Sequence, residues 1–319
     1  MVIGVDLGGT NVRAALVTSG GEIGGPRVEK PSRAREGVAA CLDSVADTIL
    51  EAAAGVEPSS VGIAIPGHID GLDGVVRWAP NFGTGLGEEF QMWLDVPFTE
   101  GLSERIPFRI HIGNDANLAA IGEYRFGSGK RTANGLVLFT LGTGLGSGVV
   151  LAPECVHGGL TRATVLFGNG GGAAELGHIT IVKDGALCSC GARGHAEAYL
   201  GGIGLLTLAA KFGAEGSSPK AIFVAAENGD SSALQTWALF GSYLGIVISC
   251  AIHSYGPEIV AIGGQVAKAA KYFLPSAIES AREASVASLF ANSRIAVAEK
   301  IDDAGILGAG ALALEADEA

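Results

Sequence analysis

Two short turns rich in glycine and threonine constrain the fold of this chain more than any other feature. The sequence DLGGTN begins at Asp6 and the sequence TLGTGLG begins at Thr140, and each turn lies between two apolar, strand-like segments. Adjacent glycines let backbone N–H groups point at an anion, and threonine adds a hydroxyl donor. Because both halves repeat this pattern, the sequence predicts a duplicated α/β fold with one phosphate-binding turn in each half. A glycine-rich hairpin without a ligand is the alternative for either turn alone.

The segments around these turns predict a mixed α/β layer in each half. Apolar residues recur at helical spacing between 35 and 54, and the N-terminal strands are expected to form an antiparallel meander. Strands are expected at 2–6, 12–17, 22–28, 61–67, 108–112, 136–141, 146–152 and 258–262, and helices at 35–54 and 115–127.

Composition excludes several classes of protein. The 319 residues are 48% hydrophobic and 17% charged, which excludes a disordered chain, and this length favours about two domains. Glycine accounts for 50 residues, more than twice the usual share of roughly 7%, without a collagen period. The net charge of −12 disfavours nucleic acid as a partner. No run of about 18 apolar residues and no signal-type N-terminus is found, so we expect a cytoplasmic protein without a membrane partner.

The cysteines indicate a pair of metal ligands and not a disulfide framework. The chain has five, an odd number, and Cys188 and Cys190 are separated by one residue. Reduced thiols with a possible metal site are the interpretation.

The motifs, taken in order, resemble one family. They are DLGGTN (6–11), GIAIPGHID (62–70), APN (79–81), GNDAN (113–117), TLGTGLGSGVV (140–150), ELGH (175–178), CSCGARGHAEAY (188–199) and IVAIGG (259–264). Together they resemble the ROK family (repressors, open reading frames, kinases) of sugar kinases, within the wider fold of hexokinase, actin and the Hsp70 ATPase domain. The resemblance implies duplicated actin-like (ribonuclease H-like) ATPase domains with a cleft between them. It divides the chain into a small domain, 1–113 completed by a C-terminal helix at about 303–319, and a large domain, 114–302, that carries a zinc site.

The resemblance also assigns a nucleotide site. It implies that both turns hold the ATP phosphates, that IVAIGG lies against the adenosine, and that Asp6 holds Mg²⁺ through water. A buried hydrogen-bonding aspartate beside a turn is the alternative for Asp6. The expected residues are Asp6, Gly8, Gly9, Thr10, Asn11, Thr140, Gly142, Thr143, Gly144, Gly263 and Gly264.

Asp115 is the candidate catalytic residue. It follows the strand FRIHI and precedes a helix, so the residues alone predict a helix N-cap. The resemblance implies that it takes the proton from the sugar hydroxyl that attacks the γ-phosphate, a role that capping does not exclude. The resemblance also places sugar-binding residues around a hexose, with a surface glutamate and a core histidine as the alternative for the ELGH pair. These residues are Asn81, Asn114, Asp115, Glu175, His178 and Glu197.

A structural zinc is predicted at His178, Cys188, Cys190 and His195. Two thiolates and two imidazoles form a closed tetrahedral ligand set. The family usually has a cysteine where this chain has His195, and a glycine where it has Ala174; the segment 153–172 is also longer than usual. Free thiols beside a surface histidine are the alternative.

The sequence therefore predicts an ATP-dependent hexose kinase, with glucose as the favoured substrate and phosphorylation at the 6-hydroxyl. Kinases for N-acetylglucosamine, N-acetylmannosamine, mannose or fructose are alternatives, as are a non-catalytic sugar-sensing protein and a structural actin-like ATPase. The first phosphate strand begins at Val2, so we expect no DNA-binding helix-turn-helix ahead of it. A homodimer is the family expectation.

Overall fold

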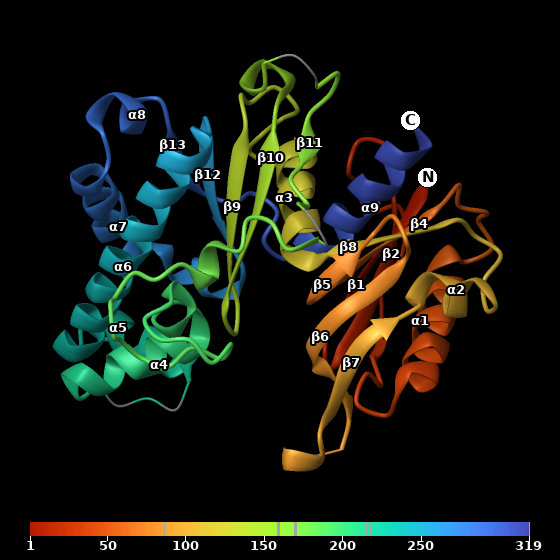
Figure 1. Ribbon diagram of the computed structural model, residues 1–319, viewed down its shortest axis with the longest axis horizontal. Coiled ribbons are helices and arrows are strands. Elements are labelled where there is room, and N and C mark those ends of the chain that lie inside the picture. Colours follow the sequence, from red (N-terminus) through yellow and green to blue (C-terminus); the bar gives the residue numbers. More distant parts are fainter. Residues whose placement is uncertain (86, 158–159, 169–170, 215, 217, 319) are drawn as a thin grey trace. The chain divides into compact units, whose positions relative to one another are not determined.

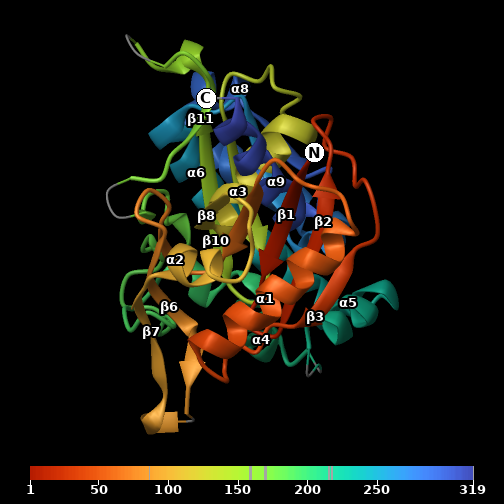
Figure 2. The ribbon, with the colours of Figure 1, turned by 90° about the vertical axis from the view of Figure 1, so that its right-hand side faces the viewer.

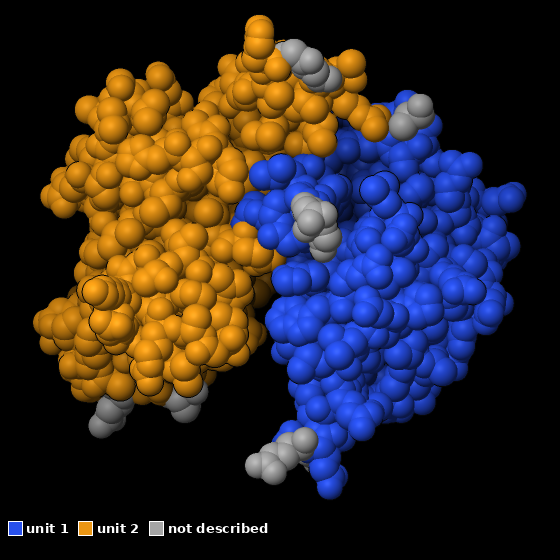
Figure 3. All heavy atoms as spheres, in the orientation of Figure 1, with its two compact units in different colours: residues 1–131, 165–174, 303–319 blue, residues 132–164, 175–302 orange. Residues whose placement is uncertain are grey.

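The computed structural model describes residues 1–85, 87–157, 160–168, 171–214, 216 and 218–318 (Figure 1). The chain forms two compact units, coloured in Figure 3. The first comprises residues 1–131, 165–174 and 303–319, and the second comprises residues 132–164 and 175–302.

The first unit is built on a five-stranded sheet of order β3-β2-β1-β4-β8. Its strands are β1 (Val2–Leu7), β2 (Asn11–Val17), β3 (Val28–Pro31), β4 (Val61–Ile65) and β8 (Ile110–Asn114). The first three strands form the expected antiparallel meander, and β4 and β8 run parallel to β1. The third strand was expected at 22–28, which is wrong: it begins at Val28, and only Ile23 pairs earlier, in an isolated bridge to Val17. The preceding Gly24-Gly25-Pro26 explains the shift, because proline cannot donate to a ladder.

Helices cover both faces of this sheet. Helix α1 (Val38–Ala53) packs on Ile3 and Val5, and Figure 2 shows it lying over the sheet. Helix α9 (Ala304–Asp317) packs on Val2 and Val17. Gly4 and Gly62 face α9, where a Cβ on either would collide with the helix backbone. The absence of these side chains is what allows the helix to approach the strands so closely.

Helix α3 (Asp115–Phe126) belongs to the first unit, whereas the sequence analysis assigned it to the large domain, 114–302. Its Gly122 meets Gly308 of α9 at backbone distance. Arg125, whose side chain is 2% exposed, forms ion pairs with Glu315 and Glu318. This packing against the C-terminal helix holds α3 in the first unit.

A three-stranded antiparallel sheet, β5-β6-β7, completes the first unit. Its strands are β5 (His68–Asp70), β6 (Val75–Thr84) and β7 (Gln91–Val96), followed by helix α2 (Phe98–Ser103). The ring of Trp93 on β7 packs against the ring of Phe82 on β6 and against that of Phe98 on α2. This aromatic core fixes β6, the strand that carries Asn81.

The second unit repeats the central arrangement of the first. Its sheet has the order β11-β10-β9-β12-β13, with β9 (Leu136–Leu141), β10 (Leu145–Leu151), β11 (Thr164–Val165), β12 (Ile259–Gly263) and β13 (Arg294–Val297). The hairpin β9–β10 is antiparallel and β12 runs parallel to β9, just as β4 runs parallel to β1 beside the first hairpin. The predicted duplication is confirmed.

Helices make up most of the remainder of the second unit. They are α4 (Gly201–Phe212), α5 (Pro219–Glu227), α6 (Ser231–Tyr255), α7 (Ala270–Ala284) and α8 (Ala287–Ala291). Gly241 and Gly245 of α6 face the backbone of α7, so the two helices pack closely. Among the described helices, α6 alone has the length and hydropathy of a membrane span, but it also buries Trp237 and Phe240 against Phe273, as a core helix does.

Candidate functional site

The first glycine-threonine turn joins β1 to β2. Asp6 pairs with Arg13 across the hairpin, and the Arg13 guanidinium forms an ion pair with the Asp6 carboxylate. The first turn of α9 lies on the same carboxylate, because a Cβ on Gly305 would collide with it. A helix N-terminus and a guanidinium both favour a negative charge. Asp6 is therefore an anchored but accessible carboxylate, with a side chain that is 21% exposed.

Two backbone hydrogen bonds hold this turn in place, one within it and one from the end of β3. The amide of Gly8 donates to the carbonyl of Asn11 at 2.9 Å, and the amide of Ser32 donates to the carbonyl of Thr10 at 2.8 Å. Gly9, Thr10 and Asn11 are exposed. The Asn11 side chain donates to Glu29 of β3 at 2.6 Å. The exposed part of the turn is available to a ligand, with the Asn11 amide directed to β3.

Asn114 and Asp115 lie where β8 ends and α3 begins. Asn114 is the N-cap: its side chain accepts from the amide of Asn117 at 3.0 Å and donates to the carbonyl of Gly67 at 2.9 Å. The prediction of Asp115 as the cap is wrong by one residue, because Asn114 holds the extended conformation that a cap requires. Asp115 is the first helical residue, half-buried, and its Oδ1 accepts from the amide of Ala116 at 2.8 Å.

The second turn joins β9 to β10 and meets the start of α4. The amides of Gly202 and Ile203 donate to the carbonyls of Gly142 and Thr143, at 2.8 and 3.3 Å. The turn thus caps a helix that has no side-chain cap. Gly142 and Thr143 remain exposed.

Gly263 and Gly264 lie beside this second turn. Gly263 pairs with Thr140 across the parallel strands β12 and β9. Gly264 has a φ of 81° and lies against the backbone of Leu141, where a side chain would collide. The structure therefore brings the expected phosphate and adenosine residues of the second unit together at the ends of β9 and β12.

Four potential metal ligands converge in the same unit. His178 ends a 3₁₀ turn, η4 (Leu176–His178), and the ligand atoms of His178, Cys188, Cys190 and His195 all lie within 4.8 Å of one another. Cys190 Sγ is 3.2 Å from His195 Nδ1, and Cys188 Sγ is 3.6 Å from His178 Nδ1. Neighbouring ligand atoms around a tetrahedral zinc are about 3.3–3.8 Å apart, given its usual bond lengths. The residues present therefore fit zinc, and Cys188 is buried, which raises the pKa of its thiol while no metal is bound.

Glu175 and Glu197 lie beside the second turn. Glu175 directly precedes η4, and Gly177 of η4 lies against the carbonyl of Leu145. Glu197 is in η5 (Ala196–Ala198), and its carboxylate rests on Gly144, where a Cβ would collide with it. The second unit thus gathers Glu175, His178 and Glu197, while Asn81, Asn114 and Asp115 belong to the first unit.

Two residues of this site were missed by the sequence reasoning. Arg13, the partner of Asp6, could have been found from its place opposite Asp6 in a predicted hairpin. Ser189, whose hydroxyl donates to Glu197 at 2.6 Å, had no signal beyond its place between two cysteines.

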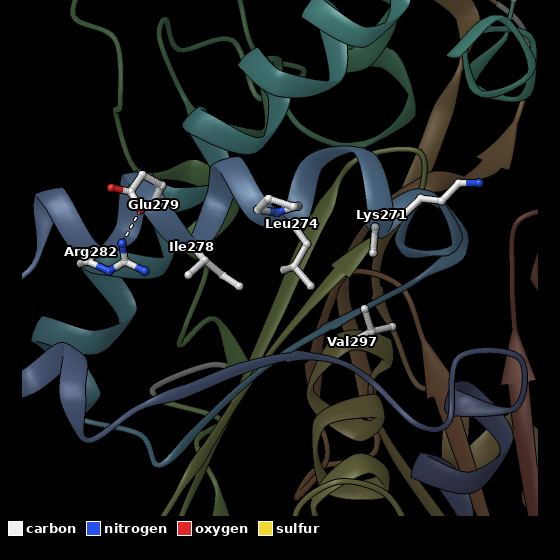
Figure 4. Close-up of a pocket in the computed structure, with 8 residues that line it drawn as sticks. Lys271, Leu274, Ile278, Glu279, Arg282 and Val297 are labelled. Atoms are coloured by element: carbon white, nitrogen blue, oxygen red, sulfur yellow. Dashed lines mark hydrogen bonds and ion pairs between the residues drawn. The ribbon is translucent and has the colours of Figure 1, made fainter. Parts of the chain in front are cut away.

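A groove between α7 and β13 lies outside this constellation (Figure 4). Its floor is apolar, from residues such as Leu274, Ile278 and Val297, and Arg282 pairs with Glu279 at its edge. None of the expected site residues is among those that line it.

The repeated hairpins define the class of the protein as an α/β protein with the actin-like ATPase fold. Solved structures with this fold include a ROK hexokinase from Thermus thermophilus, 28% identical with a TM-score of 0.82, covering 100% of this chain and 99% of that one. A ROK family glucokinase from Streptomyces griseus, in complex with glucose and AMPPNP, is 27% identical with a TM-score of 0.81, covering 98% of this chain and 99% of that one.

Sequence relatives agree with the structural ones. A glucokinase from Thermotoga maritima is 34% identical over 98% of this chain and 97% of the relative. A glucokinase from Halalkalibacterium halodurans is 30% identical over 97% of this chain and 93% of the relative. The ROK family model matches residues 2–316. The chain belongs to the ROK family.

Proposed function

We propose that this protein is an ATP-dependent hexose kinase that phosphorylates glucose at the 6-hydroxyl. Glucokinases similar to nearly the whole chain support the reaction, and the Streptomyces griseus glucokinase structure holds glucose and AMPPNP. The observation that carries the proposal is the place of Asp115: a half-buried carboxylate at the first position of a helix that Asn114 caps.

In this proposal Asp115 is the general base. Its carboxylate accepts the proton of the sugar 6-hydroxyl while that oxygen attacks the γ-phosphorus of ATP. The bond from the γ-phosphorus to the bridging oxygen breaks, and the products are the sugar 6-phosphate and ADP. Phosphoryl transfer depends mainly on positioning and charge stabilisation, so one base together with Mg²⁺ and phosphate-binding turns would be a sufficient set.

The phosphate donor is assigned to the two turns. The proposed ATP-binding residues come from both units. They are Gly8, Gly9, Thr10 and Asn11 in the first unit, and Thr140, Gly142, Thr143, Gly144, Gly263 and Gly264 in the second. Asp6 is the proposed residue for Mg²⁺, held through water. An accessible carboxylate suits this ion, which keeps several of its waters. Mg²⁺, when bound, neutralises charge on the transferred phosphoryl group.

The sugar is assigned to Asn81, Asn114, Asp115, Glu175, His178 and Glu197. His178 can serve both the sugar and the metal, because its Nδ1 faces Cys188. An imidazole that binds metal through Nδ1 carries its proton on Nε2, which can then donate to a sugar hydroxyl.

The proposed structural ion is zinc, bound by His178, Cys188, Cys190 and His195. These four side chains would supply a complete tetrahedral ligand set, so the ion would have a structural role and not bind substrate. Glu197 follows His195 by two residues, and the zinc would hold the loop that presents it. A homodimer, a cytoplasmic location and the absence of a nucleic-acid partner belong to the same proposal.

An assay of ADP release tests the function. Glucose, mannose, fructose, N-acetylglucosamine and N-acetylmannosamine are compared with ATP as the donor, and product chemistry identifies the phosphorylated hydroxyl. The highest kcat/KM is expected for glucose. A higher value for another hexose would reassign the substrate within the kinases, whereas sugar binding without ADP release would make the protein a sugar sensor.

A further inference from the structure

We infer that Ser189 is a positioning residue, whose hydroxyl group orients the Glu197 carboxylate toward the hydroxyls of the sugar. The inference rests on the proposed function, in which Glu197 binds the hexose. Ser189 lies between the two cysteines of the metal set, on an exposed part of the loop. Its Oγ donates a hydrogen bond to Oε1 of Glu197 at 2.6 Å. This is a short bond to a charged acceptor, the stronger class of protein hydrogen bond.

The second oxygen of the same carboxylate has a separate neighbour. Oε2 of Glu197 lies 3.4 Å from the amide of Leu145, and it rests on Gly144, where no side chain intervenes. The carboxylate is therefore held on two sides, by the metal loop and by the β9–β10 turn. A group that is already ordered loses less conformational entropy when a ligand binds.

The adjacent cysteine cannot replace this serine. Cys188 Sγ is 3.8 Å from the same Oε1, and it is 3.9 Å from Ser189 Oγ. At these distances the sulfur is a weaker partner for Oε1 than the Ser189 hydroxyl at 2.6 Å. Ser189 is therefore the donor that holds this carboxylate oxygen, and without it the carboxylate is expected to change its orientation.

The arrangement selects a class of ligand. Each carboxylate oxygen has about two acceptor sites, and Ser189 occupies only one of them on Oε1. The remaining sites can accept from two neighbouring hydroxyl groups, which is a pattern that a sugar ring offers. Removal of the Ser189 hydroxyl should therefore weaken binding of the sugar and leave binding of the phosphate donor unchanged.

The test compares Ser189→Ala with Ser189→Thr, which keeps the hydroxyl. Arg193→Ala is the matched control, because Arg193 belongs to the same loop and contacts only the Gly185 carbonyl among the hydrogen bonds described. Glucose affinity is measured by calorimetry without ATP, together with the KM values for glucose and ATP, kcat, and zinc content. For Ser189→Ala we expect the glucose Kd and KM to rise roughly fivefold to twentyfold, on the scale of one lost hydrogen bond to a charged group. The KM for ATP and the zinc content should stay within twofold, and the threonine variant should restore glucose affinity.

Three results would overturn the inference. The first is a glucose affinity of Ser189→Ala equal to that of Arg193→Ala. The second is loss of zinc from Ser189→Ala. The third is a glucose affinity of Ser189→Thr as low as that of Ser189→Ala. A double-mutant cycle of Ser189→Ala with Glu197→Ala, which removes the acceptor, is read as the free energy of unfolding and tests the pair without any sugar; zero coupling also overturns the inference. Failure of the proposed function is a separate result, since it would be seen in the wild-type protein as no phosphorylation of any hexose.

Discussion

Asp6 and Arg13 lie directly opposite each other on β1 and β2, and their side chains form an ion pair at the mouth of the first glycine-threonine turn. Both side chains are partly exposed, Arg13 at 43% and Asp6 at 21%, so the pair contributes little to folding stability. We expect the pair to matter for binding of the phosphate donor, because the guanidinium fixes the carboxylate that we assign to Mg²⁺.

Replacing Arg13 by glutamine should therefore weaken the use of ATP and leave sugar binding nearly unchanged. We expect kcat/KM for ATP to fall roughly tenfold, on the scale of one charge-assisted hydrogen bond. The glucose KM should change less than twofold. Arg33→Gln is the control, since among the described residues the ion-pair partner of Arg33 is Glu36, on the surface. Equal kinetics in both variants would remove Arg13 from the site.

Asp115→Asn should lower kcat by roughly 10²- to 10⁴-fold, the usual contribution of a general base. Glucose affinity, measured by calorimetry, should be largely retained. Asp43→Asn serves as the comparison, because Asp43 is an exposed carboxylate paired with Arg105. A variant with more than half of the wild-type kcat would show that Asp115 is not the base.

The cap of α3 can be separated from the chemistry. Asn114→Ala should cost about 1 kcal/mol in the free energy of unfolding, because Asn114 is the cap. Asp115→Asn should cost less than Asn114→Ala, since an asparagine side chain can still accept the hydrogen bond from the Ala116 amide and loses mainly the favourable charge at the helix start. Urea unfolding of both variants measures this, and the reverse order of costs would contradict the assignment of the cap.

Metal analysis decides the zinc site. Protein purified without chelator should contain about one zinc per chain, and His195→Ala should lose it, because a four-ligand site tolerates few losses. The same variant should raise the glucose KM more than the ATP KM. His157→Ala, a change at an exposed histidine outside the cluster, should keep its zinc. A zinc-free wild-type protein with full activity would refute the site.

His111 on β8 should make stability depend on pH. Burial lowers its pKa below the usual 6.5, and Arg109 adds to this, while Asp317 opposes it. Because the unfolded chain then binds the proton more tightly, this contribution is present above pH 6.5 and is lost as the pH falls below that value. The free energy of unfolding should therefore decrease between pH 7 and 5. His111→Phe should reduce this decrease relative to His157→Ala in urea titrations, and an unchanged slope would contradict the prediction.

Ala174 offers a stabilising change. Its φ of 61° lies in the left-handed region, which a residue with a Cβ rarely adopts. An alanine there costs about 1 kcal/mol relative to glycine. Ala174→Gly should therefore raise the free energy of unfolding by up to about 1 kcal/mol. Ala225→Gly, inside helix α5, should lower it by a similar amount. A destabilised Ala174→Gly would show that the turn carries no such strain.

Local signals in the sequence predicted the central strands and the ligand cluster, because apolar runs, glycine turns and the cysteine pair all act over short distances. The hairpins at Asp6 and Thr140 were found in this way. Features that depend on geometry were not predicted. Asn114 and Asp115 are equally good capping residues, so only backbone conformation distinguishes them. The contact of Ser189 with Glu197 requires the fold of the whole metal loop.

The way α4 begins has a consequence for the second turn. A trans peptide unit is planar, with its C=O and N–H pointing in opposite directions. The carbonyls of Gly142 and Thr143 are drawn toward the amides of α4. The amides that share those peptide units, on Thr143 and Gly144, must therefore point away from the helix. The helix thus aims two proton donors before any nucleotide arrives, and a change at the start of α4 would misdirect them without touching the turn itself.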